Sequence, residues 1–66
     1  MNIQLNGKSF EVDAELTVQQ ALQKWKYLSS AVAVAVNETF VPRSQYDRWV
    51  IRDGDRIEVV SAMQGG

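Results

Sequence analysis

One helical pattern among several strand patterns is the feature that most constrains how this chain folds. Thr17 and Gln20 fit a capping box, in which each side chain accepts a hydrogen bond from the other residue's backbone N–H. The apolar residues behind this cap recur at helical spacing and form one stripe: Val18, Ala21, Leu22 and Trp25. The pattern fades after Tyr27, and no second helical stripe follows it. One helix can cover only one face of a sheet.

Strand patterns lie on both sides of this helix. Residues 3–12 alternate apolar and polar side chains around Asn6-Gly7, which favours a hairpin with a type I′ turn. Residues 31–36 are wholly apolar with a valine at every second position, as expected of a central strand. A short strand at 39–41 ends at a proline, which confines it to a sheet edge. The alternation over residues 56–60 predicts the last strand.

These elements predict an α+β fold, the β-grasp or ubiquitin-like arrangement, with a mixed sheet of four to five strands and one helix packed on one face. The first and last strands both alternate strongly, so we expect them to be neighbours in the centre of the sheet. Residues 1–61 would form this domain, and residues 62–66, which lack an apolar pattern, would form a flexible C-terminal tail. The face without the helix is expected to dock a protein partner through Ala33, Ala35 and Val60.

Composition excludes several classes of function. The chain has no Cys and no His, so it lacks thiolate metal ligands and the commonest general base, and we expect neither an enzyme nor a stably bound metal or cofactor. Its net charge of −1 argues against a nucleic-acid partner. It contains no run of about 18 apolar residues and no signal-peptide pattern, which predicts a cytoplasmic protein that does not bind a membrane.

Two local motifs have structural explanations. Asp53-Gly54-Asp55 lacks the further ligands of a calcium loop, and Asx-type turn chemistry explains it more simply. Aromatic and basic residues interleave over residues 43–52, as they do in some single-stranded nucleic-acid sites. Because Asp47 and Asp53 dilute that charge, we expect Trp49 to close a small core instead.

The sequence ends in Gly65-Gly66. A glycine has no Cβ, so a glycine carboxylate can enter a slot that is too narrow for other residues. Fully extended, the last residues could reach roughly 15 Å beyond the sheet, far enough to enter the active site of a partner. The Gly66 carboxylate is therefore the expected site of chemistry, and Gly65 is expected to give it access.

Several motifs together resemble the ThiS family, the small sulfur carriers of thiamine (thiazole) biosynthesis. In chain order they are Val36-Asn37, Val41-Pro42-Arg43, Asp53-Gly54-Asp55 and Gly65-Gly66, and the resemblance covers the whole chain. One residue departs from the pattern: Glu38 stands where such proteins often have glycine, so a different type of turn is expected there. This departure affects none of the residues expected to carry chemistry.

The resemblance implies a carrier on which other enzymes act. A ubiquitin-activating-like adenylyltransferase would use ATP and magnesium to convert the Gly66 carboxylate to an acyl-adenylate. A sulfur donor, such as a cysteine desulfurase or a persulfide protein, would displace AMP and leave a thiocarboxylate on Gly66. Thiazole synthase would then receive the sulfur.

Three alternatives remain open on the sequence. The small subunit of molybdopterin synthase shares the fold, the tail and the thiocarboxylate chemistry, but such subunits are usually longer and do not typically carry Val-Pro-Arg at this position. A ubiquitin-like protein modifier would use the same Gly66 to form an isopeptide bond with lysine. A β-grasp binding module without covalent chemistry would make no use of the terminal glycines.

Overall fold

The computed structural model describes residues 1–27 and 31–61. The expected tail, residues 62–66 with Gly65 and Gly66, therefore lies outside the described residues, and so does the segment 28–30. The elements follow one another in this order: β1 (Asn2–Leu5), β2 (Lys8–Glu11), β3 (Leu16–Thr17), α1 (Val18–Lys24), β4 (Ala31–Val36), β5 (Thr39–Phe40), the 3₁₀ helix η1 (Arg43–Gln45), β6 (Val50–Ile51) and β7 (Arg56–Ser61).

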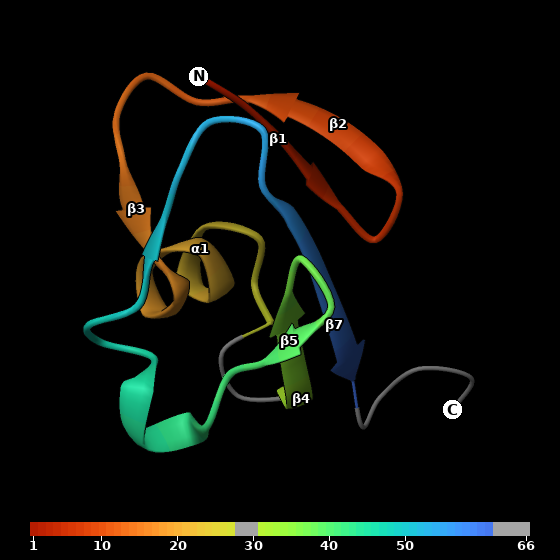
Figure 1. Cartoon of the computed structure of the whole chain (residues 1–66), viewed down its shortest axis with the longest axis vertical. Coiled ribbons are helices and arrows are strands. Elements are labelled where there is room, and N and C mark those ends of the chain that lie inside the picture. Colours follow the sequence, from red (N-terminus) through yellow and green to blue (C-terminus); the bar gives the residue numbers. More distant parts are fainter. Residues whose placement is uncertain (28–30, 62–66) are drawn as a thin grey trace.

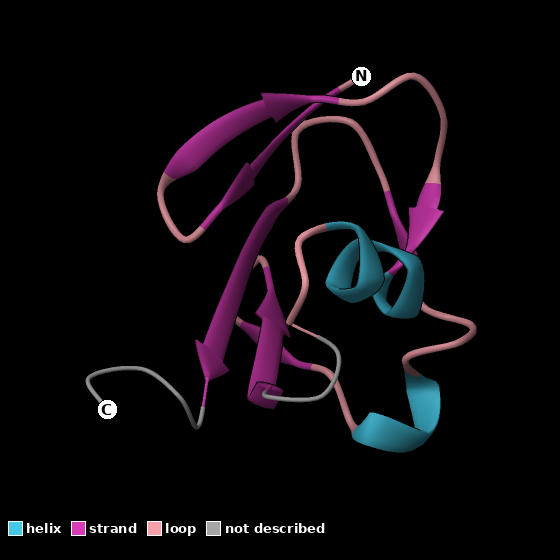
Figure 2. Ribbon diagram, turned by 180° about the vertical axis from the view of Figure 1, so that it is seen from behind, coloured by secondary structure: helices cyan, strands magenta, loops and turns pink. Residues whose placement is uncertain are grey.

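Five of these strands form a mixed sheet in the order β2-β1-β7-β4-β5. The first strand, β1, pairs with the last, β7, in parallel, and the other three pairings are antiparallel. Figures 1 and 2 show the β1–β2 hairpin on one side of β7 and the β4–β5 hairpin on the other. The prediction of a mixed four- to five-stranded sheet with the first and last strands at its centre is confirmed.

The helix begins as expected and ends earlier than the sequence pattern indicated. Thr17 is the N-cap, and its capping box with Gln20 is fully formed. α1 ends at Lys24 because the next turn closes as a Schellman motif, in which Lys26 adopts a φ of 65° and donates to the Gln23 carbonyl. The Tyr27 N–H donates to the Leu22 carbonyl at 2.7 Å and completes the motif.

A small second sheet was not anticipated from the sequence. β3 and β6 pair antiparallel, with Leu16 opposite Ile51 and Thr17 opposite Val50. Strands of two residues are too short to show a period, so only the folded chain reveals them. This pairing places the half-buried Trp49 against the core, as expected of that residue.

The core lies between α1 and one face of the five-stranded sheet. Buried side chains come from α1, from the three central strands and from the segment around β6. In β7 the alternation is complete, because Ile57 and Val59 are buried whereas Glu58 and Val60 are exposed. Trp25 also packs against this core, and its ring centroid lies 5.0 Å from that of Phe10.

Both hairpins of the sheet turn through two residues with positive φ. Asn6 and Gly7 have φ of 50° and 84°, and Asn37 and Glu38 have φ of 51° and 69°. Positive φ at both central positions is the signature of a type I′ turn. The expectation of a different turn type at Glu38 is therefore wrong, because the strand geometry imposes the same turn although glutamate is strained in it.

Candidate functional site

The face of the sheet opposite α1 is open and partly apolar. Ala33 lies opposite Val60, and Ala35 lies opposite both Phe40 and Glu58, so these side chains share that face. Val60 is 55% exposed, and Ala33 and Ala35 are half-buried. The structure thus brings together the three residues that the sequence analysis assigned to docking. Their role in docking remains a prediction.

Phe40 is the residue of this face that sequence reasoning missed. Its side chain is 62% exposed, which makes it the most exposed large apolar residue among the described residues. The sequence could have indicated this position, because a two-residue turn at residues 37 and 38 places Phe40 opposite Ala35 on the same face. Phe40, Ala33, Ala35 and Val60 together form what we call the apolar patch. Exposed apolar groups gathered in this way mark protein interaction surfaces.

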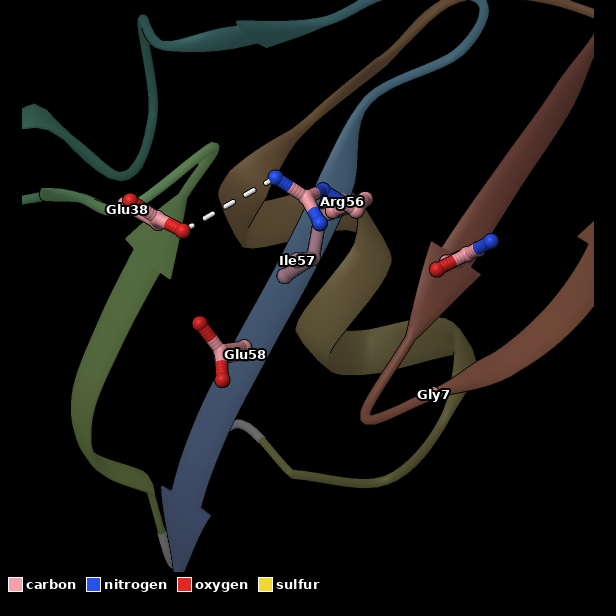
Figure 3. Close-up of a pocket in the computed structure, with 6 residues that line it drawn as sticks. Gly7, Glu38, Arg56, Ile57 and Glu58 are labelled. Carbon is pink, nitrogen blue, oxygen red and sulfur yellow. Dashed lines mark ion pairs between the residues drawn. The ribbon is translucent and has the colours of Figure 1, made fainter.

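The other half of the open face is polar and hollowed. A shallow hollow of about 240 Å³ lies over β7 and between the two hairpin turns, lined by Gln4, Gly7, Glu38, Arg56, Ile57 and Glu58. Figure 3 shows the Arg56 side chain turned toward Glu38, and their closest charged atoms are 3.8 Å apart. Both side chains are exposed, so this ion pair contributes at most about 1 kcal/mol to stability.

The Asp53-Gly54-Asp55 motif is a structural loop. The Asp53 carboxylate accepts from the Asn2 N–H at 2.6 Å, and the Asp55 carboxylate accepts from the Arg52 N–H and from the Asn37 side chain. Within residues 1–27 and 31–61, no three Asp, Glu, His or Cys side chains are arranged to hold a metal ion. The interpretation of this motif as a turn is confirmed.

The chemistry expected at Gly66 lies outside the described residues, and so does the access role expected of Gly65. What the structure does place is the origin of that segment. β7 ends at Ser61, directly after Val60 of the apolar patch. The last described residue of the chain is therefore next in sequence to the patch. Across the described chain, no helix has the length and apolar character needed to cross a membrane.

Comparison with known proteins decides the family. Residues 3–66 match the ThiS family. The chain belongs to the ThiS family. The sulfur carrier protein ThiS of Escherichia coli is 30% identical over 66 residues, and the alignment covers 100% of both chains.

Solved structures of ThiS proteins agree with this assignment. The crystal structure of a thiamine biosynthesis protein (ThiS) from Geobacter metallireducens matches with a TM-score of 0.83 and 33% identity, and the match covers 100% of both chains. The β-grasp prediction is thus confirmed, and the family is one of small carrier proteins rather than enzymes. A thiazole synthase from Paramagnetospirillum magneticum is 35% identical over 66 residues, which cover the whole of this chain and 20% of that protein.

Proposed function

We infer that this chain is the sulfur carrier protein of thiamine biosynthesis, and we propose that it carries sulfur as a thiocarboxylate on Gly66. The observation that carries this inference is the similarity to the E. coli sulfur carrier over the full length of both chains. The match to the ThiS family extends to Gly66, so it includes the terminal glycine pair. The rest of the chain supplies a stable platform and a docking face.

The proposed chemistry starts from a poor electrophile. A carboxylate oxygen of Gly66 attacks the α-phosphate of ATP, held with magnesium by a ubiquitin-activating-like adenylyltransferase, and pyrophosphate leaves. The terminal sulfur of a donor persulfide then attacks the acyl carbon and displaces AMP. Cleavage of the remaining S–S bond by a thiol reductant releases the Gly66 thiocarboxylate. None of these steps requires a catalytic side chain from the carrier, which suits a chain without Cys or His.

We propose that the apolar patch docks both enzymes. A partner can approach the patch closely where its side chains are small, at Ala33, Ala35 and Val60. Phe40 supplies the large aromatic side chain typical of interface hot spots. Because Val60 is followed at once by the end of β7, a partner seated on the patch also lies next to the start of the carrier segment. Docking would then use a residue near the end of β7, close in sequence to the segment that delivers sulfur.

The similarity to a thiazole synthase supports thiazole synthase as the acceptor. That synthase contains a segment similar to the whole of this chain. A carrier-like segment within a synthase indicates that the two act together. The same observation favours the thiamine pathway over a molybdopterin synthase subunit.

ATP–pyrophosphate exchange tests the first step. With the cognate adenylyltransferase and ATP-Mg, wild-type carrier should promote exchange, because adenylation of Gly66 is reversible. A chain with one alanine added after Gly66 should not, whereas its thermal unfolding should equal that of the wild type. Exchange that survives the extension would exclude Gly66 as the site. Adducts joined at lysine would identify a protein modifier, and no exchange with a demonstrably active enzyme would point to a binding module.

A further inference from the structure

Two asparagine side chains hold β7, Asn37 at its first residue, Arg56, and Asn6 at Val59 in its second half. Asn6 and Asn37 are the first residues of the two hairpin turns, with φ of 50° and 51°. Each lies directly after a strand that flanks β7, Asn6 after β1 and Asn37 after β4. Because β1 runs parallel and β4 antiparallel to β7, the two turns lie on either side of that strand, with Asn37 beside its first residue and Asn6 beside its middle.

The Asn6 amide acts on β7 as a further peptide group of β1 would. Its Oδ1 accepts from the Val59 N–H at 2.8 Å, and its Nδ2 donates to the Val59 carbonyl at 3.3 Å. The Asn6 backbone N–H donates to the Ile57 carbonyl at 2.9 Å, so the side chain continues the ladder beyond the end of β1. Both main-chain polar groups of Val59 are thereby satisfied by one side chain.

Asn37 binds the beginning of β7 with one backbone and one side-chain group. Its backbone N–H donates to the Arg56 carbonyl at 2.8 Å, and its Oδ1 accepts from the Arg56 N–H at 2.9 Å. Figure 3 shows the two turns on either side of β7, marked by Gly7 and Glu38. The two amides differ in what they bind. The Asn6 amide pairs with both main-chain groups of Val59, whereas the Asn37 Oδ1 accepts from the Arg56 N–H and its Nδ2 donates to the Asp55 carboxylate at 2.9 Å.

Of the two residues held in this way, Val59 is the one nearer the end of β7. Val59 is followed by only two more residues of β7, Val60 and Ser61. On the other side of β7 the pairing with β4 is irregular at this place, because the register shifts between Ala31 and Ala33. Val60 and Ser61 still pair with Ala33 and Ala31 of β4, so the Asn6 amide and this irregular pairing together fix the course of the strand where it ends.

We propose that Asn6 is a positioning residue for sulfur loading: its amide fixes the course of β7 close to Ser61 and so the platform from which Gly66 is presented to the loading enzyme. This inference rests on the proposed function, because it concerns delivery of Gly66. Asn6 touches no reacting atom and does not belong to the apolar patch. Its loss should therefore change how often Gly66 reaches the reactive position and leave docking unchanged.

Asn6→Gly and Asn37→Gly form a matched pair for the test. Glycine accepts the positive φ at either turn, so each variant removes only the amide. With the adenylyltransferase and ATP-Mg, Asn6→Gly should lower kcat for adenylation about tenfold, since small misplacements of reacting groups have effects of this order or larger. The KM for the carrier should stay unchanged. Asn37→Gly should change neither constant. Equal effects of the two variants, an unchanged kcat in Asn6→Gly, or a change confined to KM would overturn the proposal.

Hydrogen exchange separates this inference from the proposed function. Asn6→Gly should accelerate exchange of the Val59 amide and leave the Arg56 amide protected, and Asn37→Gly should do the reverse. Unaltered exchange at Val59 would refute the role of Asn6 even where loading proceeds. A wild-type chain that is never adenylated would refute the proposed function and the loading role together, while the exchange result would still decide the contact. If Asn6→Gly does not fold, Asn6→Asp, which keeps the acceptor and loses the donor, should show the lower kcat at unchanged KM, and a wild-type kcat there would overturn the proposal.

Discussion

The two hairpins that flank β7 share one turn geometry and differ in almost everything that faces solvent. Both turn through an asparagine and a second residue with positive φ, and both use the asparagine amide to hold β7. The second residue is Gly7 in one and Glu38 in the other. On the open face, the β1–β2 hairpin presents Gln4 and Ser9, which are polar, whereas the β4–β5 hairpin presents part of the apolar patch.

This difference teaches how so short a chain divides its tasks. Both hairpins add strands to the sheet, and both bury apolar residues beneath α1. Among the described residues, the β4–β5 hairpin contributes Phe40, Ala33 and Ala35 to the apolar patch, and the β1–β2 hairpin contributes the amide that holds Val59. Both hairpins that flank β7 therefore support the fold, whereas docking is assigned to the β4–β5 side and positioning to the β1–β2 side.

The largest effect should come from the covered face of β7, the strand that the hairpins share. Val59 is 4% exposed and Val60 is 55% exposed, although they are neighbours. Val59→Thr places a hydroxyl in the core and should lower the free energy of unfolding by about 2 kcal/mol. Val60→Thr should stay within about 0.5 kcal/mol of the wild type. Urea denaturation measures both, and equal losses would contradict the assignment of the two faces.

The next effect should separate the two hairpins on the open face. Phe40→Ser should raise the KM for the carrier in the adenylation assay about tenfold, equivalent to about 1.4 kcal/mol, because it removes the aromatic group of the apolar patch. Ser9→Ala, on the polar hairpin, should leave that KM unchanged, and both variants should unfold close to the wild type. If Ser9→Ala raised the KM as much as Phe40→Ser, docking would not be confined to the β4–β5 hairpin.

A smaller effect concerns the turn that already has glycine. Gly7 has a φ of 84°, and nothing lies within 4 Å of the position that a Cβ would take. Gly7→Ala should therefore cost only the backbone strain, about 1 kcal/mol after the reduced entropy of the unfolded chain is counted. Thermal unfolding at several urea concentrations measures it. A neutral substitution would show that this turn relaxes out of the I′ geometry.

The smallest effect is an expected increase in the free energy of unfolding, in the turn between β4 and β5. Glu38→Gly removes the strain of a positive φ and also removes the exposed ion pair with Arg56. The net gain should be about 0.5 kcal/mol, because the greater freedom of the unfolded chain and the lost pair offset part of the relief. The same denaturation experiment detects it. Destabilisation by Glu38→Gly would mean that Glu38 contributes more through Arg56 than its geometry indicates.

Local patterns predicted most of this fold from the sequence. The capping box at Thr17, the Asn6-Gly7 turn and the alternation of β7 each depend on neighbouring residues, and each is confirmed. The β3–β6 pairing and the exposure of Phe40 depend on which strands meet, which no local period records. The same holds for the Asn6 amide, because the turn was predictable and its partner Val59 lies 53 residues away in the chain.

The mass of the loaded chain tests the central claim most directly. The wild-type protein is incubated with its adenylyltransferase, ATP-Mg, a persulfide donor and a thiol reductant. The masses of the intact chain and of its C-terminal peptide are then measured by mass spectrometry. The account predicts a gain equal to the replacement of one oxygen by sulfur, confined to the peptide that ends in Gly66. An unchanged mass with active enzymes, or sulfur bound anywhere else in the chain, would contradict it.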